Sequence, residues 1–289
     1  LECKACKSEC PTGVDMARMK AEFLHSYHRD HGTPLRSRLL AHPARMARWG
    51  CRLSPASNWI LRSRPARWLA EKFLGLSRHR LPPVFASQTL HDWWEERGGP
   101  KNRLRSDSLK SDPTAAPVVL FNDTFTNYFE PANGSAAVEV LEAAGLNVEL
   151  HSHGCCGRPL ISQGFLDEAR EQARANLKEL VPLAEHGRRI LFCEPSCLSA
   201  LRDDVPSLLR GDEQRQARAV AGCCMLFEEF LEQECSAGRL RLGLKSGPEH
   251  ILLHGHCHQK ALGLLAPAIA LLSRIPGSTV TDPDAGCCG

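Results

Sequence analysis

The stretch VELHSHGCCG (residues 148–157) places two adjacent cysteines, Cys155 and Cys156, directly after a short strand. A related stretch, STVTDPDAGCCG (residues 278–289), repeats this order. The glycine after each cysteine pair permits a positive φ, so the turn can aim both preceding thiols toward one ligand. The sequence therefore predicts two loops of the same kind, each at the end of a strand.

Other short apolar strands alternate with helices on both sides of this stretch. Strands are predicted at residues 118–121, 148–150, 189–192, 251–254 and 278–281. Helices are predicted at residues 135–144, 167–180, 197–209, 216–231 and 258–272. Because strands that alternate with helices of ten or more residues form βαβ units, we predict an α/β fold around a parallel sheet. The order of strand, helix, strand and Cys-Cys-Gly occurs twice, which indicates a partial repeat.

Most cysteines in this part of the chain follow a predicted strand. In open α/β sheets, ligands bind at the carboxyl ends of the strands, so these thiols are expected at one edge of the sheet. The cysteines that we expect at such a metal or redox site are Cys155, Cys156, Cys197, Cys257, Cys287 and Cys288. Cys197 also begins a predicted helix, whose dipole favours the thiolate that binds metal. Cys223 and Cys224 fall inside the helix predicted at 216–231, and we interpret them as packing residues.

Three further cysteines lie in the stretch LECKACKSECP (residues 1–11). Cys3, Cys6 and Cys10 have the C-x2-C-x3-C-P spacing, which is the later part of the run that binds cubane [4Fe–4S] clusters. The first cysteine of that run would stand one residue before Leu1. We predict that the three thiols bind a cubane cluster and that Asp15 caps a helix over 16–27. A structural zinc knuckle is the alternative, but it lacks a fourth ligand nearby.

Composition restricts the class of protein. The chain has 289 residues, 43% of them hydrophobic, which is long enough for two domains. Its 14 cysteines include three adjacent pairs, and neighbouring cysteines rarely form a disulfide with one another. Metal or redox chemistry in a reducing compartment, the cytoplasm, therefore fits better than a disulfide scaffold. No apolar run reaches the length of a transmembrane helix, no signal peptide is visible, and a net charge of +3 gives no argument for nucleic acid.

Residues 25–110 are predicted to be helical and are rich in arginine and proline. Trp49, Trp59 and Trp68 are interleaved with the arginines. This order favours amphipathic helices whose arginines are solvated. Docking of a partner, or of an anionic membrane surface, stays open as the alternative. From residue 101 to residue 117 the composition changes to that of a linker.

With these motifs in hand, the chain resembles the iron–sulfur part of FAD-linked 2-hydroxyacid dehydrogenases, of the fused bacterial D-lactate or D-2-hydroxyglutarate type. The resemblance rests on CKACKSECPTGVDM (3–16), residues 20–24, LFNDTFTNYFEP (120–131), CCGRPLI (155–161), EPSCL (194–198), HGHCHQKAL (254–262) and residues 278–289. It implies that the segment lacks parts of the whole protein at both ends. The implied order is the end of an α-helical ferredoxin-like module (1–24), a helical connector and linker (25–112), a first cysteine-rich α/β repeat (113–235) and an incomplete second one (236–289).

The resemblance also implies a ligand set for each repeat, of the form C…CC-G…C-x2-C. The first repeat departs from it, because Thr124 stands where the leading cysteine would be and Glu194 replaces the partner of Cys197. Cys193 lies one residue away from that partner position. Whether this repeat binds metal stays open. The second repeat keeps Cys257 and the final cysteine pair.

In this family an FAD-binding oxidase domain precedes the segment, so the flavin and hydroxyacid sites are expected outside it. The resemblance therefore implies an electron-transfer segment, with no catalytic residue of its own, that passes electrons from flavin through [4Fe–4S] clusters to a quinone or another redox protein. A position at the inner face of the membrane fits this. The alternatives are a zinc-stabilised docking module and a thiol–disulfide enzyme like heterodisulfide reductase, acting through one of the cysteine pairs.

Overall fold

The computed structural model describes residues 3–100, 117–151 and 154–285, and its fold is mixed α/β with parallel sheets, as predicted. The larger sheet has four parallel strands in the order β2-β1-β3-β4. The strands are β1 (Val118–Leu120), β2 (Val148–Leu150), β3 (Ile190–Phe192) and β4 (Cys224–Leu226). Three of the four are buried along their whole length, which suits the apolar sequences that predicted β1 and β3.

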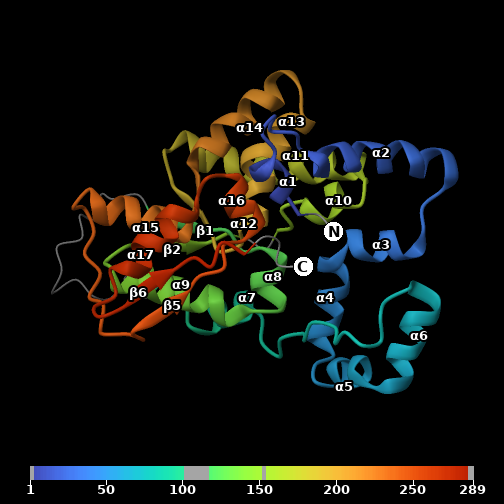
Figure 1. The fold of residues 1–289 in the computed structure, drawn as a ribbon, viewed down its shortest axis with the longest axis horizontal. Coiled ribbons are helices and arrows are strands. Elements are labelled where there is room, and N and C mark those ends of the chain that lie inside the picture. The colour runs from blue at the N-terminus through green and yellow to red at the C-terminus, as the bar shows by residue number, and fades with distance from the viewer. Residues whose placement is uncertain (1–2, 101–116, 152–153, 286–289) are drawn as a thin grey trace.

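Helices cover both faces of this sheet (Figure 1). They are α8 (Thr124–Tyr128), α9 (Pro131–Ala143), α10 (Arg158–Ser162), α11 (Leu166–Glu185), α12 (Pro195–Ser199), α13 (Val205–Leu208), α14 (Gly211–Cys223) and α15 (Phe227–Ser236). Because side chains alternate along a strand, Phe192 packs on one face with α11 and α14, and Leu191 packs on the other with α9 and α15. A π-helical turn, η2 (Ala200–Asp204), joins α12 to α13.

A second, two-stranded sheet contains β5 (His250–Leu252) and β6 (Thr279–Thr281), which are also parallel. Between them lie α16 (Cys257–Ala261) and α17 (Leu265–Ser273). The single helix predicted at 258–272 is interrupted at Gly263, where a φ of 70° ends α16. The elements of the predicted second repeat are present, and its identity as a repeat stays a prediction.

Most of residues 25–100 are helical, as predicted, but residues 75–89 form no helix, so the prediction is wrong for that stretch. The helices are α1 (Ala5–Glu9), α2 (Met16–His31), α3 (Leu35–Ala41), α4 (Pro43–Arg52), α5 (Ala56–Arg62), α6 (Arg64–Leu74) and α7 (Leu90–Glu96). Asp15 caps α2, as predicted, by accepting a hydrogen bond from the backbone amide of Arg18. Helices α2 and α3 pack on α10, and α4 packs on α8, whereas α5 and α6 extend away from the large sheet (Figure 1). The residues of the predicted linker up to 116 lie outside the described ranges.

The prediction of one helix over residues 216–231 is wrong. Helix α14 ends at Cys223, and the next three residues form strand β4, which pairs with β3 from Cys224 to Leu226. The short apolar run Cys224-Met225-Leu226 is fully buried, and such a run fits a buried strand as well as a buried helix. The neighbouring strand settled its conformation, and Cys224 is a packing residue, as expected.

Candidate metal centre

Three of the predicted thiols meet at the carboxyl edge of the large sheet. Cys155 and Cys156 lie in the loop after β2, and Cys197 lies in α12, after β3. Cys156 and Cys197 are 3% and 1% exposed, and the thiol of Cys156 interacts with those of both Cys155 and Cys197. Thr124, the first residue of α8, faces Cys155. The structure therefore brings together the two thiols of the first Cys-Cys-Gly loop and the thiol of Cys197 in α12.

The backbone of the cysteine loop is fixed at two points. Gly157 has a φ of 84°, a conformation that L side chains rarely adopt, and α10 begins at the next residue. The side-chain amide of Asn176 in α11 donates a hydrogen bond of 3.0 Å to the carbonyl oxygen of Cys155. These two features fix the backbone of the loop from which Cys156 reaches Cys197 in α12.

Burial and mutual interaction make these thiols weak acids in the metal-free protein. The hydrogen bond with Cys156, followed by burial, raises the pKa of Cys155. The hydrogen bond with Cys156 lowers the pKa of Cys197, but burial and the nearby carboxylates of Asp123 and Glu194 outweigh it and raise the value to about 12. Because metal binds thiolates, loading of this site must release protons, and a cation must compensate the buried negative charge. The chemistry of the donor set fits iron or another thiophilic metal.

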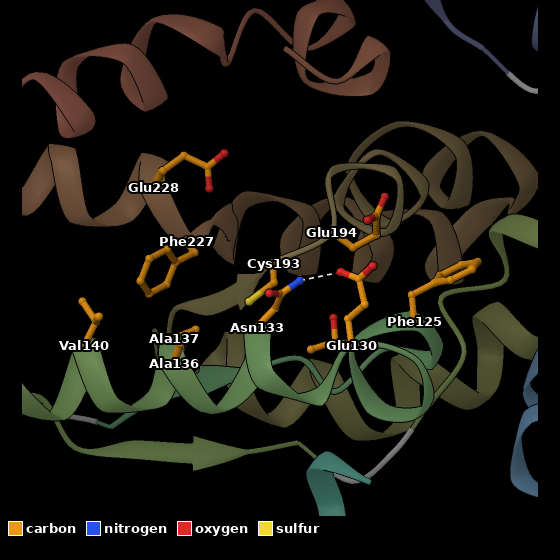
Figure 2. A pocket seen from close by; sticks show the side chains of 11 residues that line it. Phe125, Glu130, Asn133, Ala136, Ala137, Val140, Cys193, Glu194, Phe227 and Glu228 are labelled. Carbon is orange, nitrogen blue, oxygen red and sulfur yellow. Dashed lines mark hydrogen bonds between the residues drawn. The ribbon is translucent and has the colours of Figure 1, made fainter. Parts of the chain in front are cut away.

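Neither Glu194 nor its neighbour Cys193 supplies a fourth thiol to this group. The carboxylate of Glu194 accepts a hydrogen bond of 3.1 Å from the backbone amide of Ser196 and so caps α12. Cys193 points toward the opposite face of the sheet, where it lines a pocket of about 330 Å³ together with Phe227 and Glu228 (Figure 2). Within the described part of the chain, no three His, Cys, Asp or Glu side chains converge as ligands of one metal ion.

The N-terminal cysteines lie in and around α1. Cys6 is inside the helix, Cys3 precedes it and Cys10 follows it, and all three are partly exposed. The side chain of Thr12, 3.1 Å from the Cys10 sulfur, and the backbone amides of Val14 and Thr12 lower the pKa of Cys10 to about 7. A sulfur surrounded by backbone amides is stabilised as a thiolate, the form that ligates iron. The donor set thus fits the predicted cubane cluster.

One helix connects the two groups of cysteines. Helix α16, which begins at Cys257, packs against α1 on one side and against α12 on the other (Figure 1). The helix that begins at Cys257 therefore lies in contact with both the helix of the N-terminal cysteines and the helix that contains Cys197. Of the other predicted site residues, Cys287 and Cys288 lie outside the described residues.

A buried group of charges, which sequence reasoning missed, also joins the two regions. The ammonium of Lys4, which is 1% exposed, lies 3.0 Å from Asp204, 3.1 Å from Asp203 and 3.1 Å from Asp15. The guanidinium of Arg158 lies 2.6 Å from the other carboxylate oxygen of Asp204. Lys4 stands between Cys3 and Cys6, and Arg158 stands two residues after Cys156, so one carboxylate bridges the two cysteine motifs.

The π-helical turn η2 explains how both carboxylates reach the same place. Such a turn shifts the side chains of a helix and is frequent at functional sites, and here it presents Asp203 and Asp204 side by side toward Lys4. Burial alone would raise the pKa of Asp203, but Lys7 and Lys4 outweigh it and hold the pKa well below the usual range. No sequence signal pairs Lys4 with residues about 200 positions away, although a lysine beside a cysteine motif is a weak hint.

Comparison with known proteins adds the family context. Residues 122–202 match the family described as CCG, a cysteine-rich domain. The chain is 29% identical over 257 residues to one subunit of the anaerobic glycerol-3-phosphate dehydrogenase of Escherichia coli K12, and the match spans 88% of this chain and 61% of that subunit. It is 26% identical over 294 residues to D-2-hydroxyglutarate dehydrogenase of the same strain, a match that spans all of this chain and 27% of that enzyme.

A third relative is lactate utilization protein A 2 of Bacillus cereus Q1, 25% identical over 178 residues, which are 60% of this chain and 71% of that protein. No solved structure matches the chain. The chain thus spans less than two thirds of the glycerol-3-phosphate dehydrogenase polypeptide and about a quarter of the D-2-hydroxyglutarate dehydrogenase that it matches. Its residues 122–202 match the CCG domain and the chain is similar to parts of bacterial dehydrogenases, which confirms the resemblance read from its sequence.

Proposed function

We propose that this chain is an electron-transfer segment of an FAD-dependent 2-hydroxyacid dehydrogenase. The observation that supports the proposal is the contact of α16, the helix that begins at Cys257, with both α1 and α12. These contacts make α16 the proposed link between the two groups of cysteines. The similarity to D-2-hydroxyglutarate dehydrogenase over the whole chain supports the substrate class.

In this proposal Cys3, Cys6 and Cys10 hold a cubane [4Fe–4S] cluster, and Cys155, Cys156 and Cys197, with Cys257 and the final cysteine pair, form a second metal or redox site. A bound cluster supplies one-electron transfer at a potential set by its surroundings. The chain's own residues fix those surroundings. Amides after Cys10 stabilise its thiolate, burial excludes water from Cys156 and Cys197, and the carboxylate of Asp204 holds the two motifs together.

The partners in this proposal are those that the family resemblance implies. An FAD-binding domain or subunit would donate the electrons, and a quinone or another redox protein would accept them. The proposed location is the cytoplasmic side of the membrane. No helix in the residues that the structure describes is long and apolar enough to cross a membrane.

Two alternatives are less well supported by the geometry. A thiol–disulfide enzyme needs a thiol that is accessible and easily deprotonated, whereas Cys156 and Cys197 are buried. A structural zinc site needs four ligands that converge on one ion, and no three do so in the ranges 3–100, 117–151 and 154–285. Separate iron atoms of a cluster accept thiolates that do not converge on a point.

The proposal is tested by electron paramagnetic resonance of the anaerobically purified protein after reduction with dithionite. We expect the signal of a reduced cubane cluster in the wild-type protein and its loss in Cys6→Ser. Cys51→Ser is the matched control, because Cys51 is a buried cysteine in an apolar cluster with Ala47 and Tyr128. A signal that persists in Cys6→Ser, or that is lost equally in Cys51→Ser, contradicts the assignment of the N-terminal thiols.

A further inference from the structure

The hairpin formed by α5 and α6 exposes large apolar side chains. Neither helix has a buried residue, and Trp59 and Phe73 are 77% and 72% exposed. The other exposed apolar side chains of the two helices are Ile60, Trp68 and Leu69. None of these five belongs to an apolar core of the described chain. Exposed large apolar side chains gathered on two helices that contact each other mark a site that another surface covers.

The hairpin is a well-formed structure without that cover. The hydroxyl of Ser63 caps α6 by accepting a hydrogen bond from the amide of Ala66, and Gly75 ends α6 in the left-handed conformation. Leu69 and Phe73 lie one turn apart and so share one side of α6. The apolar surface is therefore held in place by local signals that do not depend on its burial.

Positively charged side chains are frequent in the same region of the chain. The ammonium of Lys72 lies 5.1 Å from the ring of Trp68, which stands one turn earlier on α6. Residues 32–84 contain ten arginines and Lys72 but one acidic residue, Glu71, which gives a net charge of +10. Since the whole chain has a net charge of +3, the remainder carries −7. The positive charge is concentrated in the region that contains the exposed apolar side chains, and Glu71, which pairs with Arg78, balances only one of these cations.

We propose that the α5–α6 hairpin docks on an anionic lipid bilayer, with its apolar side chains at the boundary of headgroups and acyl chains and its arginines on lipid phosphates. Helices with tryptophan, phenylalanine and leucine on one side and cations beside them bind membranes in this way. Charge complementarity selects the occupant. A second copy, docked hairpin to hairpin, would bring the same positive charge, and a nucleic acid would leave the apolar side chains without a partner.

This docking rests on the proposed function and deepens it, because it brings the segment to the surface where a lipid-soluble acceptor resides. Its test, vesicle binding, does not depend on whether a cluster is bound. In Figure 1 the hairpin lies at the lower right, away from the large sheet. An interfacial hairpin needs no transmembrane helix. The sequence predicted amphipathic helices with solvated arginines. It did not predict that the tryptophans would also be exposed.

The test is co-sedimentation of the purified protein with vesicles of phosphatidylcholine alone and of phosphatidylcholine mixed with phosphatidylglycerol. We expect binding to the anionic vesicles only, weakened by high salt. The double variant Trp59→Ser/Phe73→Ser should bind at least about tenfold more weakly, because burial of one large apolar side chain is worth about tenfold or more in affinity. Arg64→Gln/Arg67→Gln should lose the preference for anionic vesicles.

The matched control is Leu252→Ser, since Leu252 is 76% exposed but lies in β5, outside the basic region. It should bind like the wild-type protein. Circular dichroism and iron content verify that each variant is folded and carries its metal, so failure of docking is distinguished from failure of the electron-transfer proposal. Equal binding to both vesicle types, no binding, or wild-type binding by Trp59→Ser/Phe73→Ser overturns the inference.

Discussion

Replacement of Lys4 by methionine tests whether the buried charges hold the two cysteine motifs together. The change removes an ammonium that lies within 3.1 Å of three carboxylates and leaves a side chain of similar length. Removing one partner of a buried ion pair costs about 3–5 kcal/mol, because the remaining charge is left buried without compensation. Asp204 keeps Arg158 at 2.6 Å and Asp203 keeps Lys7 at 2.8 Å, so we expect a loss near about 3 kcal/mol, the lower limit.

The assay is urea unfolding followed by circular dichroism. With a slope of about 3 kcal/mol per molar urea, a loss of about 3 kcal/mol lowers the midpoint by about 1 M. Arg174→Met is the control, because Arg174 and Glu213 form an ion pair with both side chains largely exposed, and such a pair contributes little. If Lys4→Met and Arg174→Met have the same midpoint, the buried charges do not stabilise the contact between the motifs.

The remaining predictions concern acid and the open ligand position. The pKa of the Asp203 carboxyl lies below its ordinary value of 3.8 in the folded protein. As the pH falls, this carboxyl is therefore protonated in the unfolded chain before it is protonated in the folded one. The free energy of unfolding then decreases as the pH drops below about 4. The unfolding free energy of Asp203→Asn should depend less on pH in that range, and an unchanged pH profile would contradict the ion pairs. Thr124→Cys adds a thiol facing Cys155 and should slow the loss of iron to a chelator, whereas Ser135→Cys in α9 should not. Equal rates of loss in both variants would exclude Thr124 from the site.

Local sequence signals predicted the sheet and its thiol edge because both depend on neighbouring residues. The apolar run before residue 121 and the glycine after Cys156 act within a few positions, and the parallel arrangement then places the loops on one edge. Strand β4 was missed because its three apolar residues follow a helical pattern and carry no turn signal of their own. Tertiary pairing with β3 decided its conformation.

Features that depend on distant residues could not be predicted in the same way. Lys4 and Asp204 are 200 positions apart, and their contact exists only because a π-helical turn presents the carboxylate. The amphipathic pattern of α5 and α6 was visible, but periodicity identifies an apolar side without saying whether the protein itself covers it. The 77% exposure of Trp59 could be known only from the packing of the folded chain.

The most direct test of the electron-transfer account is the content of iron, zinc and acid-labile sulfide per chain in anaerobically purified protein. The account predicts iron matched by an equal amount of sulfide, near about four of each for every cubane cluster. Zinc without sulfide would contradict it. The cysteines would then belong to a structural module, and the electron path from α1 through α16 to α12 would carry no electrons.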